Sequence, residues 1–163
     1  MSVTHDVFNQ ASPLVDYNLY ATNRPLRDAL AFHLPGSDEA PRLAQGARWG
    51  SGPWQTHARL ANTHPPRLLS HDRFGRRIDQ VEFHPSYHAL MGRALAHGLH
   101  GTPWAGAPGS HIARAAAFML FTELEPSVLC PVSMSYAVAP ALRASCPGRV
   151  APTVARTKGP EVT

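Results

Sequence analysis

The sequence predicts a mainly α-helical domain that carries one small β-hairpin. Apolar residues recur every three to four positions in several segments, which is the period of an amphipathic helix. Asn, Ser or Asp stands before most of these segments and proline in their first turns, as is common at helix starts. One short stretch, residues 68–83, instead shows two strand-like runs around a glycine turn.

The first 23 residues show no helical period and are predicted to form an extended arm that lies over the domain or over a neighbouring subunit. Thr22 or Asn23 should cap a first helix that has Pro25 at its start and ends near Pro35. The inner side of this helix is expected to carry Leu26, Leu30 and Phe32.

Two further helices are predicted before the hairpin. Ser37 or Asp38 should start the first of them, which covers residues 40–49. Ser51 can cap the next, with Pro53 in its first turn and residues 54–62 as its body.

The hairpin follows a double proline. Pro65 and Pro66 lack backbone donors and disfavour helical angles in the residue before them, so the preceding helix must stop. Residues 68–71 are then predicted to pair with residues 77–83 across a turn in which Gly75 supplies a positive φ.

Three helices are predicted after the hairpin. The first spans residues 85–97 and ends at Gly98. The second, residues 111–125, should be central and capped by Ser110, and the third spans residues 128–142. The apolar stripe of the central helix comprises Ile112, Ala115, Ala116, Met119, Leu120 and Leu124. Residues 144–163 are rich in Pro, Gly, Arg and Thr without periodicity, which predicts a disordered tail.

Composition indicates one soluble domain. The chain has 163 residues, 44% of them hydrophobic, and no apolar run approaches the roughly 20 residues of a membrane helix. The N-terminal residues do not resemble a secretory signal, so we expect no membrane association and a cytoplasmic location.

The basic charge could indicate a nucleic-acid partner. The net charge is +4, and Lys158 is the single lysine, so arginine carries the excess. Only Arg73, Arg76 and Arg77 are grouped, at the expected hairpin tip, where solvated charge is the ordinary solution. We expect an exposed or interface turn there, with a nucleic-acid contact as the alternative.

No catalytic or metal site is predicted. Cys130 and Cys146 are expected to be reduced thiols, with Cys130 buried as a small hydrophobe. His84 and His88 have ligand spacing, but Pro85 makes His84 a helix cap, and no thiol or carboxylate completes a zinc set. Nucleophile-elbow, phosphate-loop and dinucleotide-binding motifs are absent from the sequence.

Several segments resemble one known family. Residues 59–91 read RLANTHPPRLLSHDRFGRRIDQVEFHPSYHALM, and residues 4–20, 111–116 and 130–137 agree with them. Together they resemble the N-terminal domain of the AidB branch of the acyl-CoA dehydrogenase flavoprotein superfamily, the adaptive-response proteins linked to DNA alkylation. The resemblance covers residues 3–143 and is expected to end there.

The resemblance implies that residues 24–143 form an AidB-type N-terminal helical domain of a truncated flavoprotein. Full-length members bind FAD between a β-domain and a C-terminal four-helix domain, which also holds the catalytic base and the attributed DNA-binding role. This chain would therefore carry no cofactor and not be a competent oxidoreductase alone. Its implied partners are the remaining domains of a full-length homo-oligomer, a tetramer in the family.

The same resemblance places the last helix near the acyl substrate cavity of the full-length enzymes. Met134, Ser135 and Ala137 are then candidate substrate-channel residues, although a core stripe explains Met134 equally well. A free copy of the domain should expose the apolar face that its partners cover, and should associate or dissolve poorly. The alternative function is a stand-alone arginine-rich helical module that binds an acidic partner or nucleic acid.

Overall fold

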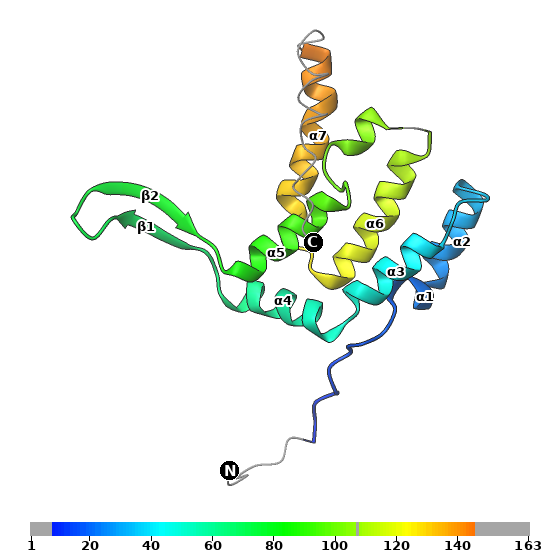
Figure 1. Ribbon diagram of the computed structural model, residues 1–163, viewed down its shortest axis with the longest axis horizontal. Helices are drawn as coiled ribbons and strands as arrows, with labels where there is room; N and C mark the ends of the chain where they lie inside the picture. Colours follow the sequence, from blue (N-terminus) through cyan, green and yellow to red (C-terminus); the bar gives the residue numbers. More distant parts are fainter. Residues whose placement is uncertain (1–7, 107, 146–163) are drawn as a thin grey trace.

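The computed structural model describes residues 8–106 and 108–145, which form a helical body with one projecting β-hairpin (Figure 1). The fold class predicted from the sequence is confirmed. In chain order the elements are α1 (Leu19–Thr22), α2 (Arg24–His33), α3 (Ala40–Trp49), α4 (Gly52–Thr63), β1 (Arg67–His71), β2 (Arg77–Glu82), α5 (Pro85–Ala96), the short 3₁₀ helix η1 (Thr102–Ala105), α6 (Ser110–Leu124) and α7 (Leu129–Ser145).

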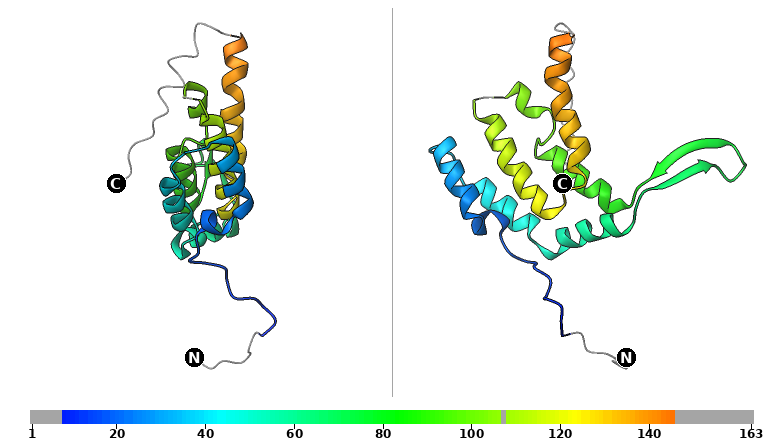
Figure 2. Two further views of the ribbon diagram at one scale, coloured as in Figure 1. Left: turned by 90° about the vertical axis from the view of Figure 1, so that its right-hand side faces the viewer. Right: turned by 180° about the vertical axis from the view of Figure 1, so that it is seen from behind.

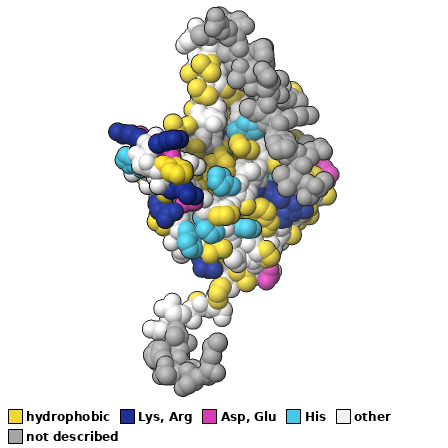
Figure 3. Space-filling model, turned by 60° about the vertical axis from the view of Figure 1, so that its left-hand side comes forward, with side chains coloured by type: hydrophobic (Ala, Val, Ile, Leu, Met, Phe, Trp, Pro, Cys, Tyr) yellow, Lys and Arg dark blue, Asp and Glu magenta, His cyan; other side chains and the backbone are white. Residues whose placement is uncertain are grey.

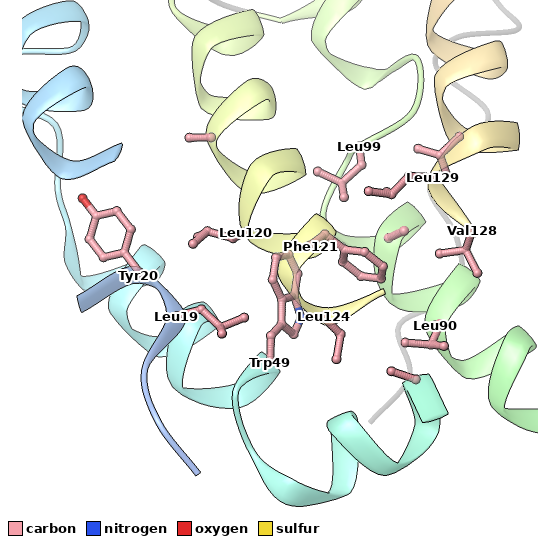
Figure 4. Close-up of a cluster of buried hydrophobic side chains, with 14 of the residues drawn as sticks. Leu19, Tyr20, Trp49, Leu90, Leu99, Leu120, Phe121, Leu124, Val128 and Leu129 are labelled. Atoms are coloured by element: carbon pink, nitrogen blue, oxygen red, sulfur yellow. The ribbon is translucent and has the colours of Figure 1, made fainter. Parts of the chain in front are cut away.

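Helix α6 lies in the middle of the body, and the other helices pack around it (Figures 1 and 2). Trp49 of α3 meets Phe121 of α6 edge to face, with ring centroids 4.9 Å apart, and neither side chain is exposed. Figure 4 shows how side chains from distant parts of the chain converge on this pair. The buried cluster includes Leu19, Tyr20, Leu90, Leu99, Leu120, Leu124, Val128 and Leu129.

The predicted arm differs from the structure at its C-terminal end. Residues 19–22 form the short helix α1, and Leu19 and Tyr20 are completely buried. Asn18 holds this turn in place, because its side-chain oxygen accepts hydrogen bonds from the N–H groups of Tyr20 and Ala21 while its amide donates to the Leu43 carbonyl. Four residues are too few to show a helical period, so the sequence pattern did not reveal α1.

Gly46 of α3 and Gly50, which directly follows this helix, let residues 16–20 approach it closely. A Cβ at Gly46 would overlap the side-chain oxygen of Asn18, and one at Gly50 would overlap the Tyr17 carbonyl oxygen. The Gly50 carbonyl also accepts a hydrogen bond from the N–H of Asp16 at 2.7 Å. The glycine spacing of four therefore gives α3 a flat strip on which residues 16–20 lie.

A buried carboxylate joins three helices. Glu125 follows α6 and is 1% exposed; it accepts hydrogen bonds at 2.9 Å from the N–H groups of Ser127 and Val128, just before α7. The amide of Asn62, on α4, donates to the same carboxylate at 3.1 Å. Burial raises the pKa of Glu125, but the hydrogen bonds from Val128, Ser127 and Asn62 outweigh it and hold the pKa below its ordinary value.

Helix starts follow the predictions in part. The side chains of Asn23 and His84 cap α2 and α5 by accepting hydrogen bonds from the N–H groups of Leu26 and Ser86. Ser51 precedes α4 as predicted, but its hydroxyl donates to the Arg48 carbonyl. Ser110 is wrong as a cap, because Gly109 takes that position.

The hairpin has the predicted pairing and turn. Strands β1 and β2 are antiparallel, with Arg67 opposite Glu82, and β2 ends one residue before Phe83. Gly75 has a φ of +79°, and the side chain of Asp72 accepts hydrogen bonds from two N–H groups of the turn. Figures 1 and 2 show the hairpin extending well away from the helices.

Several residues predicted to be inside are exposed. Phe32 is 81% exposed because it lies two positions, about 200° of helix rotation, from buried Leu30. Met119 and Ile112 are exposed on α6, so its apolar stripe is narrower than predicted. Cys130, expected to be buried, is exposed on α7.

The last described helix extends slightly beyond the expected boundary. Helix α7 reaches Ser145, whereas the helical domain was expected to end at residue 143. The remainder of the predicted tail, residues 146–163, lies outside the described residues. Among the described helices, none has the length and apolar character needed to span a bilayer.

Substituting Gly46 by alanine should destabilise the fold by roughly 1–3 kcal/mol, because the new methyl group must displace Asn18 and Tyr20. Gly92→Ala is the matched control, since a Cβ there meets nothing within 4 Å and alanine favours helix by about 1 kcal/mol. Urea unfolding of both variants measures the difference. Equal stabilities would contradict the close approach at α3.

Replacing Glu125 by glutamine should cost roughly 1–3 kcal/mol near neutral pH, because an amide nitrogen cannot accept the backbone N–H bonds. The folded-state pKa is lowered, so the carboxylate stabilises the fold above its unfolded pKa, and this contribution is lost as the pH falls through the folded value. Melting temperatures of the two proteins should therefore converge at acid pH. Glu123→Gln, at an exposed position, serves as the control and should show a smaller change.

Candidate functional site

Helix α7 has one face in the domain and one face in solvent. Leu129, Val132 and Ala139 are buried against the body. On the opposite side Met134 is 68% exposed, Val138 47% and Leu142 41%. We call this surface the α7 outer face; it consists of Cys130, Met134, Ala137, Val138 and Leu142.

The outer face is a continuous apolar strip on a protruding helix. Positions 130, 134, 138 and 142 recur every four residues, so their side chains lie above one another along one side. Figure 3 shows hydrophobic side chains on the part of the molecule that rises above the body. A long apolar strip on an exposed helix usually marks a surface that another protein segment covers.

All three predicted channel residues lie on the exposed side of α7. Met134 and Ala137 belong to the outer face, which excludes the interpretation of Met134 as a core residue. Ser135 is also exposed, and its hydroxyl donates to the Pro131 carbonyl one turn earlier at 3.1 Å. All three side chains are therefore exposed to solvent in the part of the chain that the structure describes.

The orientation of α7 is fixed by a tryptophan from outside the helix. Pro140 has no N–H, so the Tyr136 carbonyl cannot make its usual bond to the residue four positions later. The indole N–H of Trp104, on η1, donates to this carbonyl at 2.8 Å. Arg143 in turn donates to the Trp104 carbonyl.

Tyr136 is held from a second side by α6. Its hydroxyl lies 2.7 Å from Nδ1 of His111, and the Arg114 guanidinium stacks over its ring at 3.8 Å. Arg114 also donates from Nε to the Leu99 carbonyl at 2.8 Å. Burial lowers the pKa of Arg114, and the facing Tyr136 hydroxyl opposes that effect. The sequence signal for the Trp104 contact is Pro140 within α7, because this proline leaves the Tyr136 carbonyl without its usual helical donor.

The arginines are dispersed among local contacts. Four of them form ion pairs with neighbouring carboxylates, Arg24–Asp28, Arg27–Glu39, Arg67–Glu82 and Arg77–Asp79. At the hairpin tip Arg73 and Arg76 lie over the exposed Phe74 ring. Within residues 8–106 and 108–145, these arginines are engaged in separate local contacts and are not gathered on one face.

The described histidines make local structural contacts. His84 caps α5 and stacks on His64, whose ring centroid is 4.7 Å away. Across the described ranges, no three His, Cys, Asp or Glu side chains gather as metal ligands would. A cavity of about 270 Å³ between α1, α2 and the segment that joins α2 to α3 is lined by Tyr20, Leu30 and Glu39, and it is too small for a flavin dinucleotide.

Comparisons with known proteins agree with the sequence resemblance. A family model described as the adaptive response protein AidB N-terminal domain matches residues 9–158, which extends past the expected end at residue 143. AidB of Escherichia coli strain K12, whose name places it among the acyl-CoA dehydrogenases, is 39% identical over 141 residues. These residues are 85% of this chain and 26% of that protein, so the chain spans about a quarter of the relative's length.

Two solved structures share the fold. Bd2924 in its apo form is 24% identical with a TM-score of 0.71, and the match covers 85% of this chain and 28% of that one. Caenorhabditis elegans ACDH-11 in complex with C11-CoA is 20% identical with a TM-score of 0.73, over 95% of this chain and 28% of that one. In each of these two structures, the matched region is only 28% of the solved chain.

Trp104→Phe should destabilise the fold by roughly 1–3 kcal/mol, because it leaves the Tyr136 carbonyl without a donor. In a Pro140→Ala background the same change should cost less, since residue 140 then supplies the missing N–H. A double-mutant cycle by chemical unfolding measures this coupling. Trp54→Phe is the control, and its cost should be the same with and without Pro140→Ala. If Trp104→Phe also cost the same in both backgrounds, the Trp104 N–H would not compensate for the N–H that Pro140 lacks.

Proposed function

The chain belongs to the AidB N-terminal domain family, and we propose that it acts as the N-terminal helical domain of an AidB-like acyl-CoA dehydrogenase flavoprotein. In this role it contributes a packing surface and part of the substrate channel. FAD and the catalytic base belong to the remaining domains, and no reaction step is assigned to residues of this chain.

The observation that carries the proposal is the α7 outer face. Its exposed apolar side chains lie on the last described helix, so polypeptide that follows α7 in a longer protein starts close to this surface. The curated relative is nearly four times as long as the matched part, which leaves ample chain to cover it. We propose that the remaining domains pack on the α7 outer face.

Met134, Ser135 and Ala137 would then border the acyl substrate channel at this interface. Their exposure on one side of α7 supports the proposal, and the Trp104, His111 and Arg114 contacts fix the helix that presents them. The complete protein is further proposed to be a homo-oligomer, a tetramer as in the family, and to act in the cytoplasm.

We expect the purified chain to bind a version of E. coli AidB that lacks its own N-terminal quarter. Met134→Asp with Val138→Asp should weaken this binding at least about tenfold, because buried carboxylates at the interface would lack partners. Isothermal titration calorimetry measures the affinities, and circular dichroism confirms that each variant is folded.

Phe32→Asp provides the matched control, since Phe32 is an exposed apolar residue on α2. The control should bind as the unchanged chain does. Equal affinity of the α7 variant and the unchanged chain, or no binding by either, would contradict the proposed role of the outer face.

A further inference from the structure

The β-hairpin extends away from the described helices and is largely exposed (Figure 1). Every residue of β2 is exposed, and within the part of the chain that the structure describes β2 pairs with β1 alone. Leu68 and Val81 face each other across the strands and are 62% and 49% exposed. An isolated two-stranded hairpin is marginal in water, so this element requires a partner for full stability.

The base of the hairpin is nevertheless held in a fixed direction. His64 at the end of α4 stacks on His84 at the start of α5, and Phe83 stacks on Tyr87 at 4.3 Å. Pro65 and Pro66 stiffen one of the two connecting segments. The hairpin is thus presented outward before any partner arrives, which lowers the entropic cost of binding.

The side chains of β2 are ordered so that the strand complements itself. From Arg77 to Glu82 the sequence reads Arg, Ile, Asp, Gln, Val, Glu. In antiparallel orientation, Arg77 would lie opposite Glu82 of a second copy and Ile78 opposite Val81 of that copy. Each cross-strand pair occurs twice, and opposite charges or paired apolar side chains stabilise neighbouring strands.

The bulge in β2 makes this pairing geometrically consistent. Arg77 lies opposite His71 and Glu82 opposite Arg67, so Arg77 and Glu82 share one face of the hairpin. Val81 and Ile78 point to the other face, because each is adjacent to one of those residues. In a regular strand residues five apart point to opposite faces, but Asp79, with a φ of +44°, supplies the extra residue.

We propose that two copies of the chain associate through their β2 strands, which pair antiparallel about a two-fold axis at Gln80. Bulges and charges on edge strands commonly discourage contact with other chains. Here the charge changes from positive to negative along the strand, so only an antiparallel copy meets opposite charges at both ends. The paired hairpins form a four-stranded sheet, with the Arg67–Glu82 ion pair next to Arg77 of the second copy.

A charge exchange tests the pairing. Arg77→Glu places two acidic residues opposite each other, and Glu82→Arg places two basic residues opposite each other. Each single variant should weaken self-association of the chain about tenfold, because the repulsive pair occurs twice. The double variant should restore association to near the unchanged value. Sedimentation equilibrium measures the dissociation constants.

The double exchange separates the pairing from effects within one hairpin. Inside one chain the double exchange places a glutamate beside Asp79 and an arginine opposite Arg67. Both ion pairs within the hairpin are then replaced by like charges, so a loss of hairpin stability would be larger in the double variant than in either single variant. Arg24→Glu, at an exposed site on α2, controls for total charge and should not change association. A double variant no better than the singles would overturn the proposal, as would a monomeric unchanged chain.

The hairpin contact is independent of the α7 outer face. If association persists in Arg77→Glu but is lost in Met134→Gln with Val138→Gln, the β2 pairing is wrong while the proposed function stands. If association follows the charge exchange and the α7 variant leaves it unchanged, the pairing is supported. Calorimetric binding to the remaining domains then decides the proposed function separately.

Discussion

The buried carboxylate of Glu125 is the constraint on which the arrangement of α4, α6 and α7 depends. Burying a charged group is costly, and here the cost is offset by three donors that come from two separate segments. Asn62 fixes the distance to α4, and the Ser127 and Val128 N–H groups fix the direction in which α7 leaves the turn. Without this turn, α7 could not place one face on the core and the other in solvent.

The N-terminal side of the body depends on close packing between residues 16–20 and α3. Gly46 and Gly50 remove side chains where residues 16–20 cross α3, and the buried Leu19 and Tyr20 fill the space beside α6. A core of this kind leaves little apolar surface free on α1 to α4. Large exposed apolar side chains are concentrated on α7 and on the hairpin. These two elements lie on different sides of the molecule (Figure 2).

The sequence predicted most of the fold because its helices start and stop at strong local signals. Pro65 and Pro66, Gly75 and the caps at Asn23 and His84 act within a few residues of their effect. Whether a side chain is buried depends on how its helix is rotated about its own axis relative to the neighbouring helices. Local sequence signals do not determine this rotation. Phe32 and Cys130 were misplaced for that reason, and the candidate channel residues rest on resemblance.

Trp104 has a consequence beyond structure. Its indole combines a hydrogen bond to the last described helix with an edge contact to His111, whose ring centroid is 4.6 Å away. Indole emission responds to hydrogen bonding and to nearby imidazole rings. In a chain whose other two tryptophans, Trp49 and Trp54, are replaced by phenylalanine, the emission of Trp104 would report a displacement of α7 without an added label.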